Sequence, residues 1–314
     1  MSRALFIATA DLPLSENAPS FRSAEPDWYK AQRRQLRWLK ELMNHLNCPL
    51  IVAGDIFDKA ENNTPIVNFA LDELPECYAI SGNHDQPYHQ YNLLWRSGYG
   101  TLVKAGKIKE ADGVIKMDID GIDVMLHGFP FETVKNGGVR RFVRHGDIDI
   151  AVVHQFCWVT PLPNGRESKL GEYHLDEYKR KLPGYDYYIF GDNHTPFDEG
   201  NATNCGQFYR RTVNDIDYQP TVCVFYEDGT RERVNVPIDE DIIREPKKKL
   251  TDIARGRMNG DFDELFESMR NAKKVVFDAE AILKDYLVSN KVNGDVEKAI
   301  LNITESSNGG VRPK

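Results

Sequence analysis

The 314-residue sequence has few cysteines, and they form no pairing pattern. Its five cysteines are odd in number and widely spaced, and no two of them form a C-x-x-C motif. This argues against a disulfide framework and is typical of proteins from a reducing cytoplasm, where we expect the chain to reside. Cys48, Cys77 and Cys223 lie in or beside apolar runs, where a free thiol usually serves as a small core side chain.

Long hydrophobic runs and an excess of positive charge are also absent. The apolar run before Asp11 is too short for a signal peptide or a membrane span, so we expect no membrane partner. The net charge of −8 means that nucleic-acid binding cannot be argued from the global charge. It does not exclude a metal-dependent nuclease, because bound ions supply positive charge locally.

The sequence does contain a series of short apolar runs, each of which ends at a side chain that can bind metal. The runs are rich in Ile, Val, Leu, Phe and Tyr, as buried strands are. In α/β sheets ligands gather at the carboxyl ends of strands, so one edge would collect carboxylates, an amide and imidazoles. Such a mixture suits a pair of divalent metals. The runs end at Asp11, at Asp55 and Asp58, at Asn83, His84 and Asp85, at His127, at His154, and at Asp192 and His194.

These endings form motifs that resemble those of a known family. In chain order after Asp11, the motifs are GDIFD (54–58), GNHD (82–85), AVVHQ (151–155) and GDNH (191–194). Together they resemble the calcineurin-like metallophosphoesterases. The pattern is most similar to SbcD-type DNA exonuclease subunits and their bacteriophage relatives, and the segment NCGQFYRR (204–211) supports this likeness. The resemblance covers about residues 1–235.

The resemblance implies a two-metal centre, with Mn²⁺ as the expected ion and Mg²⁺ as the alternative. It assigns Asp11, Asp55 and His194 to one ion, and Asp55, Asn83, His154 and Asp192 to the other. A hydroxide that bridges the two ions, ~3.5–4 Å apart, would attack phosphorus in line. His84 would serve the leaving oxygen as a catalytic residue, and Asp58 would orient it.

Two positions depart from the family pattern. Pro13 stands where the family's Asp-x-His motif has histidine, and Asp192 stands where its Gly-His-x-His motif has the first histidine. Proline cannot bind a metal through its nitrogen, so the first ion keeps three protein ligands unless Ser15 or Glu16 substitutes. Asp192 replaces an imidazole with a carboxylate, and this oxygen-rich set favours Mn²⁺ or Mg²⁺. A degenerate, inactive site remains an alternative.

Three further residues are candidates for substrate binding. His89 follows GNHD and could line the groove, while Arg210 and Arg211 follow the last motif and could contact a phosphate. Each of the three could equally be a solvated loop or strand residue. His127 has no place in the family pattern, so we expect a structural or substrate-side role for it instead of metal ligation.

The predicted fold is α/β: a two-layer β-sandwich flanked by helices, the four-layer α/β/β/α metallophosphoesterase arrangement, with a small helical C-terminal extension. An apolar stripe predicts a helix over 28–46, and Pro65 favours a helix that begins at Thr64. Residues 218–237 read as two strands joined by a Glu-Asp-Gly turn, and we expect them in the second sheet. The other strands are expected at 49–53, 77–81, 122–127, 148–153 and 186–190.

Composition divides the chain into four parts. We expect a metallophosphoesterase domain at 1–238, a charged linker at 239–249, a helical region at 250–304 and a disordered tail at 305–314. The helices could pack on their own domain or dock on a partner. By analogy with SbcD-type subunits, the partner would be an SMC-like coiled-coil ATPase or a second copy of the chain.

These patterns together predict a cytoplasmic, two-metal-dependent phosphodiesterase that acts on DNA as an exonuclease or endonuclease. Two alternatives stay open. One is a phosphodiesterase for small nucleotides, and the other is a catalytically inactive scaffold that binds partners through the same fold.

Overall fold

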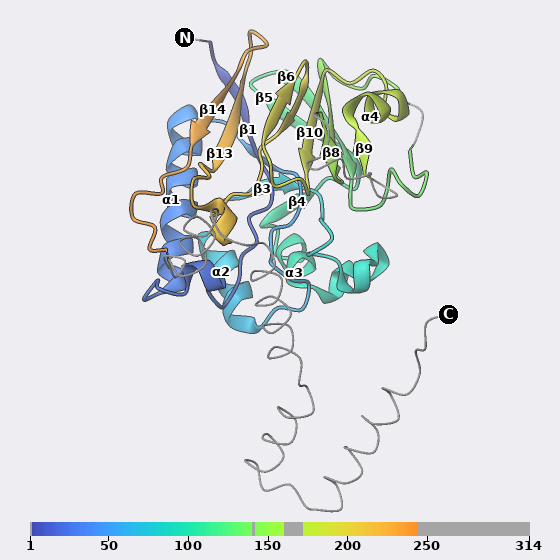
Figure 1. The fold of residues 1–314 in the computed structure, drawn as a ribbon. Helices are drawn as coiled ribbons and strands as arrows, with labels where there is room; N and C mark the ends of the chain where they lie inside the picture. The colour runs from blue at the N-terminus through green and yellow to red at the C-terminus, as the bar shows by residue number, and fades with distance from the viewer. Residues whose placement is uncertain (1, 140–141, 160–171, 244–314) are drawn as a thin grey trace, which may run out of the picture. The chain divides into compact units, whose positions relative to one another are not determined.

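The computed structural model describes residues 2–139, 142–159 and 172–243 (Figure 1). Within them, two six-stranded sheets form the centre of the fold, with strand orders β14-β13-β1-β2-β3-β4 and β11-β12-β10-β7-β6-β5. The first sheet contains β1 (Ala4–Thr9), β2 (Leu50–Val52), β3 (Cys77–Ala79), β4 (Ile108–Glu110), β13 (Thr221–Tyr226) and β14 (Arg231–Asn235). The second contains β5 (Gly113–Ile119), β6 (Ile122–Phe129), β7 (Ile148–His154), β10 (Tyr187–Gly191), β11 (Phe197–Glu199) and β12 (Ala202–Asn204).

Helices and one short strand pair complete the described part of the chain. The helices are α1 (Trp28–Leu46), α2 (Thr64–Glu73), α3 (Gly98–Lys104) and α4 (Leu175–Lys181), with 3₁₀ turns η1 (Ser20–Arg22), η2 (Pro87–His89), η3 (Tyr91–Arg96) and η5 (Val213–Asp215). β8 (Cys157–Trp158) pairs with β9 (Tyr173–His174). None of these helices is long and apolar enough to cross a membrane.

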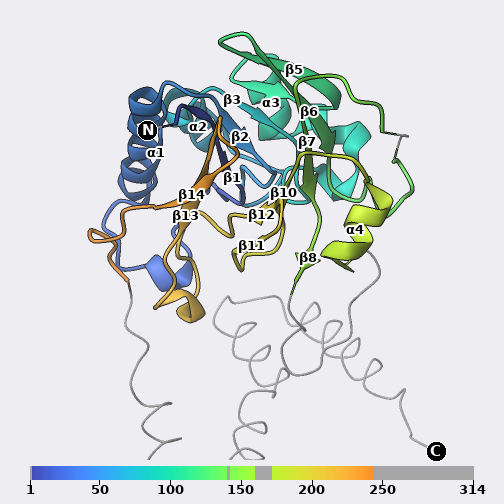
Figure 2. The same cartoon turned by 90° about the horizontal axis from the view of Figure 1, so that it is seen from above.

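The two sheets pack face to face and helices cover their outer faces. Phe6, Ile51 and Phe225 of the first sheet share a buried cluster with Ile150 and Ile189 of the second. Each such large apolar side chain stabilises the fold by about 1.5–3 kcal/mol when it is fully buried. Helices α1, α2 and α3 pack on the outer face of the first sheet, and α4 packs on that of the second (Figure 2). The predicted four-layer α/β/β/α arrangement is confirmed.

The central strands of both sheets are parallel, and this positions the site. β1, β2 and β3 run parallel in the first sheet, as do β6, β7 and β10 in the second. Parallel strands end at the same edge, so the residues that follow β1, β2, β3, β7 and β10 gather there. All the predicted metal-binding motifs belong to these ends.

Helix α1 has the bounds that the sequence pattern predicted. The Asp27 carboxylate accepts a hydrogen bond from the Lys30 main-chain nitrogen at 2.9 Å and so caps the first turn. Leu36 and Leu39 are buried against the first sheet. The helix ends where Asn47 adopts a left-handed conformation with φ of 48°, a C-terminal signal that asparagine tolerates better than most residues.

The expectation for residues 218–237 was wrong in one respect. The two strands form, as β13 and β14, but β13 pairs antiparallel with β1 and therefore extends the first sheet. Val222 and Val224 face the helix-covered side, whereas Cys223 and Phe225 face the layer between the sheets. A strand with apolar side chains on both faces fits an internal position in a sheet. This pattern does not indicate which of two stacked sheets the strand joins.

The start of the predicted linker packs on the first domain. The Asp241 carboxylate is fully buried and accepts hydrogen bonds from Arg22 at 2.8 and 3.0 Å, from Arg34 at 3.1 Å and from Arg210 at 3.1 Å. Residues 239–243 are thereby anchored. The rest of the predicted linker, the helical region at 250–304 and the tail at 305–314 lie outside the described residues.

Candidate metal centre

Three of the predicted ligands form a compact buried group. Asp11 follows β1, Asp55 follows β2 and His154 ends β7, so two of them come from the first sheet and one from the second. One ligand atom from each of the three lies within 4.8 Å of the others, and all three residues are buried. Two carboxylates and an imidazole at this spacing can bind one divalent cation.

The backbone after three strands adopts a conformation that L-amino acids rarely take. Asp11, Asp55 and Asp192 have φ values of 51°, 53° and 73°, in the left-handed region. That conformation costs roughly 1–2 kcal/mol for most side chains and less for aspartate, whose short carboxylate bonds to nearby main chain. Strained residues of this kind cluster at functional sites, and here all three carry a carboxylate at the same sheet edge.

Two motif glycines are required by the close approach of the chains. A Cβ atom added to Gly82 would lie 2.0 Å from Asp55 Oδ1 and 2.6 Å from His154 Nε2. A Cβ atom added to Gly191 would lie 2.2 Å from the Ala53 carbonyl oxygen and 2.7 Å from His154 Nδ1. The glycine of GNHD and the glycine of GDNH therefore give His154 and Asp55 the space they occupy.

Main-chain contacts determine which nitrogen of His154 is free to bind a metal. Nδ1 lies 2.6 Å from the Ala53 carbonyl oxygen, which can only accept, so Nδ1 carries the proton and donates. Nε2 lies 3.1 Å from Asn83 Oδ1 and 3.4 Å from Asp55 Oδ1. The Asp55 carboxylate outweighs the effect of burial and raises the pKa of His154, so a bound metal would take the place of a proton on Nε2. A main-chain carbonyl on the far nitrogen is the usual support of a metal-binding histidine.

The charges at this sheet edge also favour a bound cation. Burial raises the pKa of Asp11 well above its usual range, and the nearby Asp55 and Asp192 carboxylates raise it further. Asp11 Oδ2 is buried and has no hydrogen-bond partner among the residues that the structure describes. Burial likewise raises the pKa of Asp192. Burial acts in the same direction on Asp55, but His154 outweighs it and holds the pKa of Asp55 low. A dication would neutralise this carboxylate excess and satisfy the orphaned oxygen, so the residues fit the metal that the motifs imply.

The remaining predicted ligands lie around the same group. Asn83 contacts His154 as described above, and the Asp192 main-chain nitrogen donates to Asp11 Oδ1 at 3.3 Å. His194 Nε2 is 4.0 Å from Asp11 Oδ1, and its side chain is 56% exposed. The structure thus brings all six predicted ligands to one edge. The division of these ligands between two ions remains a prediction.

The two residues considered as substitutes for the missing histidine are engaged elsewhere. Ser15 Oγ accepts from Trp28 Nε1 at 3.0 Å and donates to the Asn17 carbonyl oxygen at 3.1 Å. The Glu16 carboxylate accepts from Asn63 Nδ2 at 2.7 Å. Both groups thus have hydrogen-bond partners, and that the Asp11 side of the centre has one donor fewer than the family pattern stays a prediction.

His84 is held by main chain on both sides. Its Nδ1 donates to the Asp58 carbonyl oxygen at 2.6 Å, and its own main-chain nitrogen donates to Asp55 Oδ1 at 2.9 Å. Asp58 therefore contacts the imidazole as expected, but through its carbonyl and not its carboxylate. The carboxylate accepts from Arg211 Nη2 at 2.5 Å. Since Nδ1 donates, His84 Nε2 is the nitrogen left for a substrate.

The three substrate candidates have different environments. His89 lines a groove of about 230 Å³ together with Asn83 and His84, which places it beside the centre. Arg211 is paired with the carboxylate of Asp58 and is only 20% exposed. Arg210 is buried and donates to Asp241 and to the Ile216 and Ile238 carbonyl oxygens. The structure gives Arg210 an anchoring role in place of the predicted phosphate contact.

Two supporting residues were not recognised from the sequence. The fully buried Asp85 carboxylate accepts from the main-chain nitrogens of Ile56, Phe57 and Gly82 at 3.0–3.3 Å, so it joins the GDIFD and GNHD turns. Burial and the nearby Asp55 raise its pKa to about 7. Asn204 Nδ2 donates to the carbonyl oxygens of Asn193 and Thr195, one on each side of His194. In the sequence, only the positions of Asp85 in GNHD and of Asn204 in NCGQ indicated that these two residues could support the site.

A comparison with solved structures finds matches at low sequence identity and low structural similarity. A calcineurin-like phosphoesterase, YfkN from Bacillus subtilis, is 12% identical with a TM-score of 0.44, over 81% of this chain and 97% of that one. A putative 5'-nucleotidase from Staphylococcus aureus is 15% identical with a TM-score of 0.47, over 80% of this chain and 58% of that one. A novel archaeal phosphodiesterase is 13% identical with a TM-score of 0.34, over 73% and 98% of the two chains.

The family match comes from the sequence model of the calcineurin-like phosphoesterases. Among curated proteins, no sequence matches the chain. The family model, in contrast, matches residues 6–196, which is more than half of the chain. The matched region runs from β1 to the end of the GDNH motif and contains all six residues gathered at the sheet edge. The chain therefore belongs to the calcineurin-like phosphoesterase family.

Proposed function

We propose that the protein is a divalent-metal-dependent phosphodiesterase that cleaves DNA as an exonuclease or endonuclease. The observation that carries this proposal is the buried group of Asp11, Asp55 and His154, in which one Asp11 oxygen has no partner within the described part of the chain. Burying two carboxylates beside one imidazole is costly when one carboxylate oxygen has no hydrogen-bond partner. Bound cations would offset this cost, which is why we infer that the group binds metal.

The proposed ligands divide between two ions as the family resemblance implies. Asp11, Asp55 and His194 would hold one ion, and Asp55, Asn83, His154 and Asp192 the other. When bound, divalent ions at such a site polarise the phosphate and lower the pKa of a water molecule. The three carboxylates favour Mn²⁺ or Mg²⁺ over softer ions.

The chain's own residues supply the remaining requirements of phosphodiester cleavage. The Asp58 carbonyl oxygen keeps a proton on His84 Nδ1, so His84 can give a proton from Nε2 to the leaving oxygen only as the imidazolium, a form that the anionic phosphate beside it favours. Arg211, beside Asp58, provides a guanidinium that can pair with a phosphate oxygen in the substrate complex. The groove formed by Asn83, His84 and His89 is where we place the scissile phosphate.

Exposed aromatic side chains support a nucleic-acid substrate over a small nucleotide. Tyr88 and Trp95 follow the GNHD motif in η2 and η3, and they are 71% and 75% exposed. Tyr88 also adopts a left-handed backbone conformation, with φ of 55°. Exposed aromatic rings beside a cleavage site are typical stacking partners for bases of single-stranded nucleic acid. Two such rings in successive turns suit a chain of several bases, whereas a single nucleotide has only one base to stack.

A substrate comparison in Mn²⁺ tests this proposal. We expect hydrolysis of a DNA duplex with single-stranded ends and of bis-p-nitrophenyl phosphate, but little hydrolysis of a cyclic mononucleotide. His154→Asn should be inactive, whereas His45→Ala, an exposed histidine on α1, should match the unmodified protein. Preference for the cyclic nucleotide would favour the small-nucleotide alternative. Failure to cleave any of the three would favour the inactive scaffold.

We further propose that residues 250–304 recruit a coiled-coil ATPase or a second copy of the chain, and that the protein acts in the cytoplasm. All five cysteines are unpaired and buried, as in proteins of a reducing compartment. A chain that ends at Lys247 should cleave short DNA at the normal rate but lose its partner. Loss of folding on truncation would show that these residues belong to the core of the protein.

A further inference from the structure

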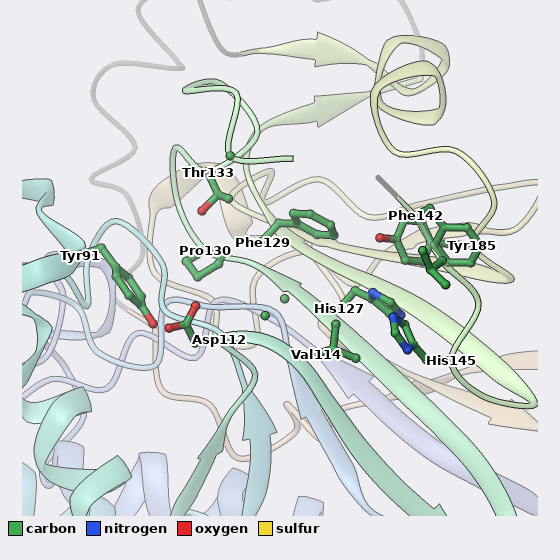
Figure 3. Close-up of a pocket in the computed structure, with 14 residues that line it drawn as sticks. Tyr91, Asp112, Val114, His127, Phe129, Pro130, Thr133, Phe142, His145 and Tyr185 are labelled. Carbon is green, nitrogen blue, oxygen red and sulfur yellow. The ribbon is translucent and has the colours of Figure 1, made fainter. Parts of the chain in front are cut away.

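A second cavity lies apart from the motif residues on the second sheet. It has a volume of about 370 Å³ and opens beside β5 and β6 (Figure 3). Its lining combines rings with polar groups: Asp112, His127, Phe129, Phe142, His145 and Tyr185. A volume of this size is in the range of small-molecule sites, which are mostly apolar with a few converging polar atoms.

The polar side of this cavity is a buried histidine–aspartate pair. His127 Nε2 lies 2.7 Å from Asp149 Oδ1, and the Asp149 side chain is fully buried. Asp149 also accepts from the main-chain nitrogens of His145 and Gly146. The carboxylate therefore fixes Nε2 of His127 as a donor and leaves Nδ1 as an acceptor. Among the described residues, no group hydrogen-bonds to that Nδ1.

His127 is uncharged near neutral pH. Burial lowers its pKa, and this effect outweighs the opposing influence of Asp149. A neutral imidazole with a free acceptor nitrogen is a hydrogen-bonding group for an uncharged ligand. The exposed His145 ring lies 5.6 Å from that of His127, centroid to centroid, and adds a second imidazole.

Aromatic rings form the wall next to the imidazoles. The Tyr185 ring is 4.9 Å from that of His127 and 4.6 Å from that of Phe142, and both pairs meet edge to face. Figure 3 shows Phe142 and Tyr185 together at one end of the cavity, with Tyr91 and Asp112 at the other. A flat ligand between these ends would have rings beside it, an imidazole acceptor at one edge and a carboxylate acceptor at the other.

We propose that this cavity binds a nucleobase, and that during cleavage it takes an unpaired base of the substrate. A nucleobase is a flat, uncharged heterocycle with donors and acceptors on its edge, and this matches the lining described above. The second part of the proposal rests on the proposed nuclease function. The first part does not.

The cavity and the candidate metal centre share a wall. Tyr91 lines the cavity, while His89, two residues earlier, lines the groove beside His84. The Phe131 ring packs on His89 at 5.6 Å, and the Phe131 main-chain nitrogen donates to the Ser81 carbonyl oxygen at 3.2 Å. Residues 87–91 and 129–133 thus separate the groove from the cavity. A DNA strand with a phosphate beside His84 could cross these residues and reach the cavity with a neighbouring base.

Binding of deoxyadenosine to the full chain in the presence of a chelator tests the base site without metal or phosphate. Calorimetry should show saturable binding at one site. Phe142→Ala and His145→Ala should each weaken it at least fivefold. The controls are Phe197→Ala, a half-buried phenylalanine at the other edge of the sheet, and His45→Ala, and both should bind as the unmodified protein does. Absence of saturable binding for all four deoxynucleosides, or unchanged affinity in both cavity variants, would overturn the proposal.

A kinetic comparison tests the link to cleavage. For Phe142→Ala and His145→Ala, the KM for a single-stranded oligonucleotide should rise at least fivefold relative to the KM for bis-p-nitrophenyl phosphate, which has no base. An unchanged ratio would disprove the substrate link. If the protein hydrolyses neither compound, the proposed nuclease function is wrong, and the deoxynucleoside result alone decides whether the base site exists.

Discussion

Replacing His84 with alanine should separate catalysis from metal binding. The Asp58 carbonyl oxygen holds His84 Nδ1, and the substitution removes the imidazolium whose Nε2–H we assign to the leaving oxygen. Loss of one general acid typically lowers kcat by about 10²–10⁴-fold. The contact of His84 with Asp55 is made by the main-chain nitrogen, at 2.9 Å, so it survives in His84→Ala. Metal affinity should therefore stay close to that of the unmodified protein.

The assay pairs steady-state hydrolysis of bis-p-nitrophenyl phosphate with calorimetric titration of Mn²⁺. Asp58→Asn is the matched control, since it keeps the carbonyl oxygen that orients His84 and removes only the carboxylate paired with Arg211. Because the imidazole and its carbonyl partner remain in place, kcat should fall less than about tenfold. Two results would refute the reasoning: parallel loss of metal and activity in His84→Ala, or equal losses of activity in the two variants.

Three further predictions concern other parts of the molecule. Pro13→His should restore the missing donor and lower the Mn²⁺ concentration for half-maximal hydrolysis. Removal of the proline costs roughly 0.4–1 kcal/mol of folding stability, because the unfolded chain gains freedom. An unchanged Mn²⁺ requirement would show that the ion site beside Asp11 already has all its ligands. Asp241→Ala should lower the free energy of unfolding, measured by denaturant titration, by about 3–5 kcal/mol, because it leaves buried arginines without their carboxylate partner. A loss below about 1 kcal/mol would contradict the anchoring role of Asp241. Burial lowers the pKa of His127 below its usual 6.5, so the unfolded chain takes up that proton first and stability falls as the pH drops through 6.5. His127→Gln should flatten the dependence of unfolding free energy on pH between about 5 and 8, and an unchanged slope would contradict the assignment.

Much of the site could be predicted because its residues occur in the same sequence pattern, directly at the end of a short apolar run. Asp11, Asp55 and His154 each end or follow a short apolar run, and parallel strands bring such ends together whatever the details of packing. Helix α1 was predictable for the same kind of reason, since its apolar stripe and the Asp27 cap are local signals. Local pattern thus predicted which residues meet.

Other features depend on packing between distant segments and have no local signal. The sheet position of β13 follows from pairing with β1, more than two hundred residues away, so the sequence pattern showed the strand without its neighbour. The left-handed conformations of Asp11 and Asp55 are held by surrounding contacts. The Asp58 contact with His84 uses a carbonyl oxygen, which every residue has, so no sequence could distinguish it from a carboxylate contact.

The Mn²⁺ dependence of bis-p-nitrophenyl phosphate hydrolysis, measured for the unmodified protein and for Asp55→Asn, tests the central claim most directly. Asp55 contributes to both proposed ion sites, so its substitution should disable the centre and leave the fold intact by circular dichroism. We predict no turnover in chelator, saturable activation by Mn²⁺, and loss of that activation in Asp55→Asn. Turnover in chelator, or Asp55→Asn that responds to Mn²⁺ as the unmodified protein does, would contradict a metal-dependent phosphodiesterase centred on Asp55.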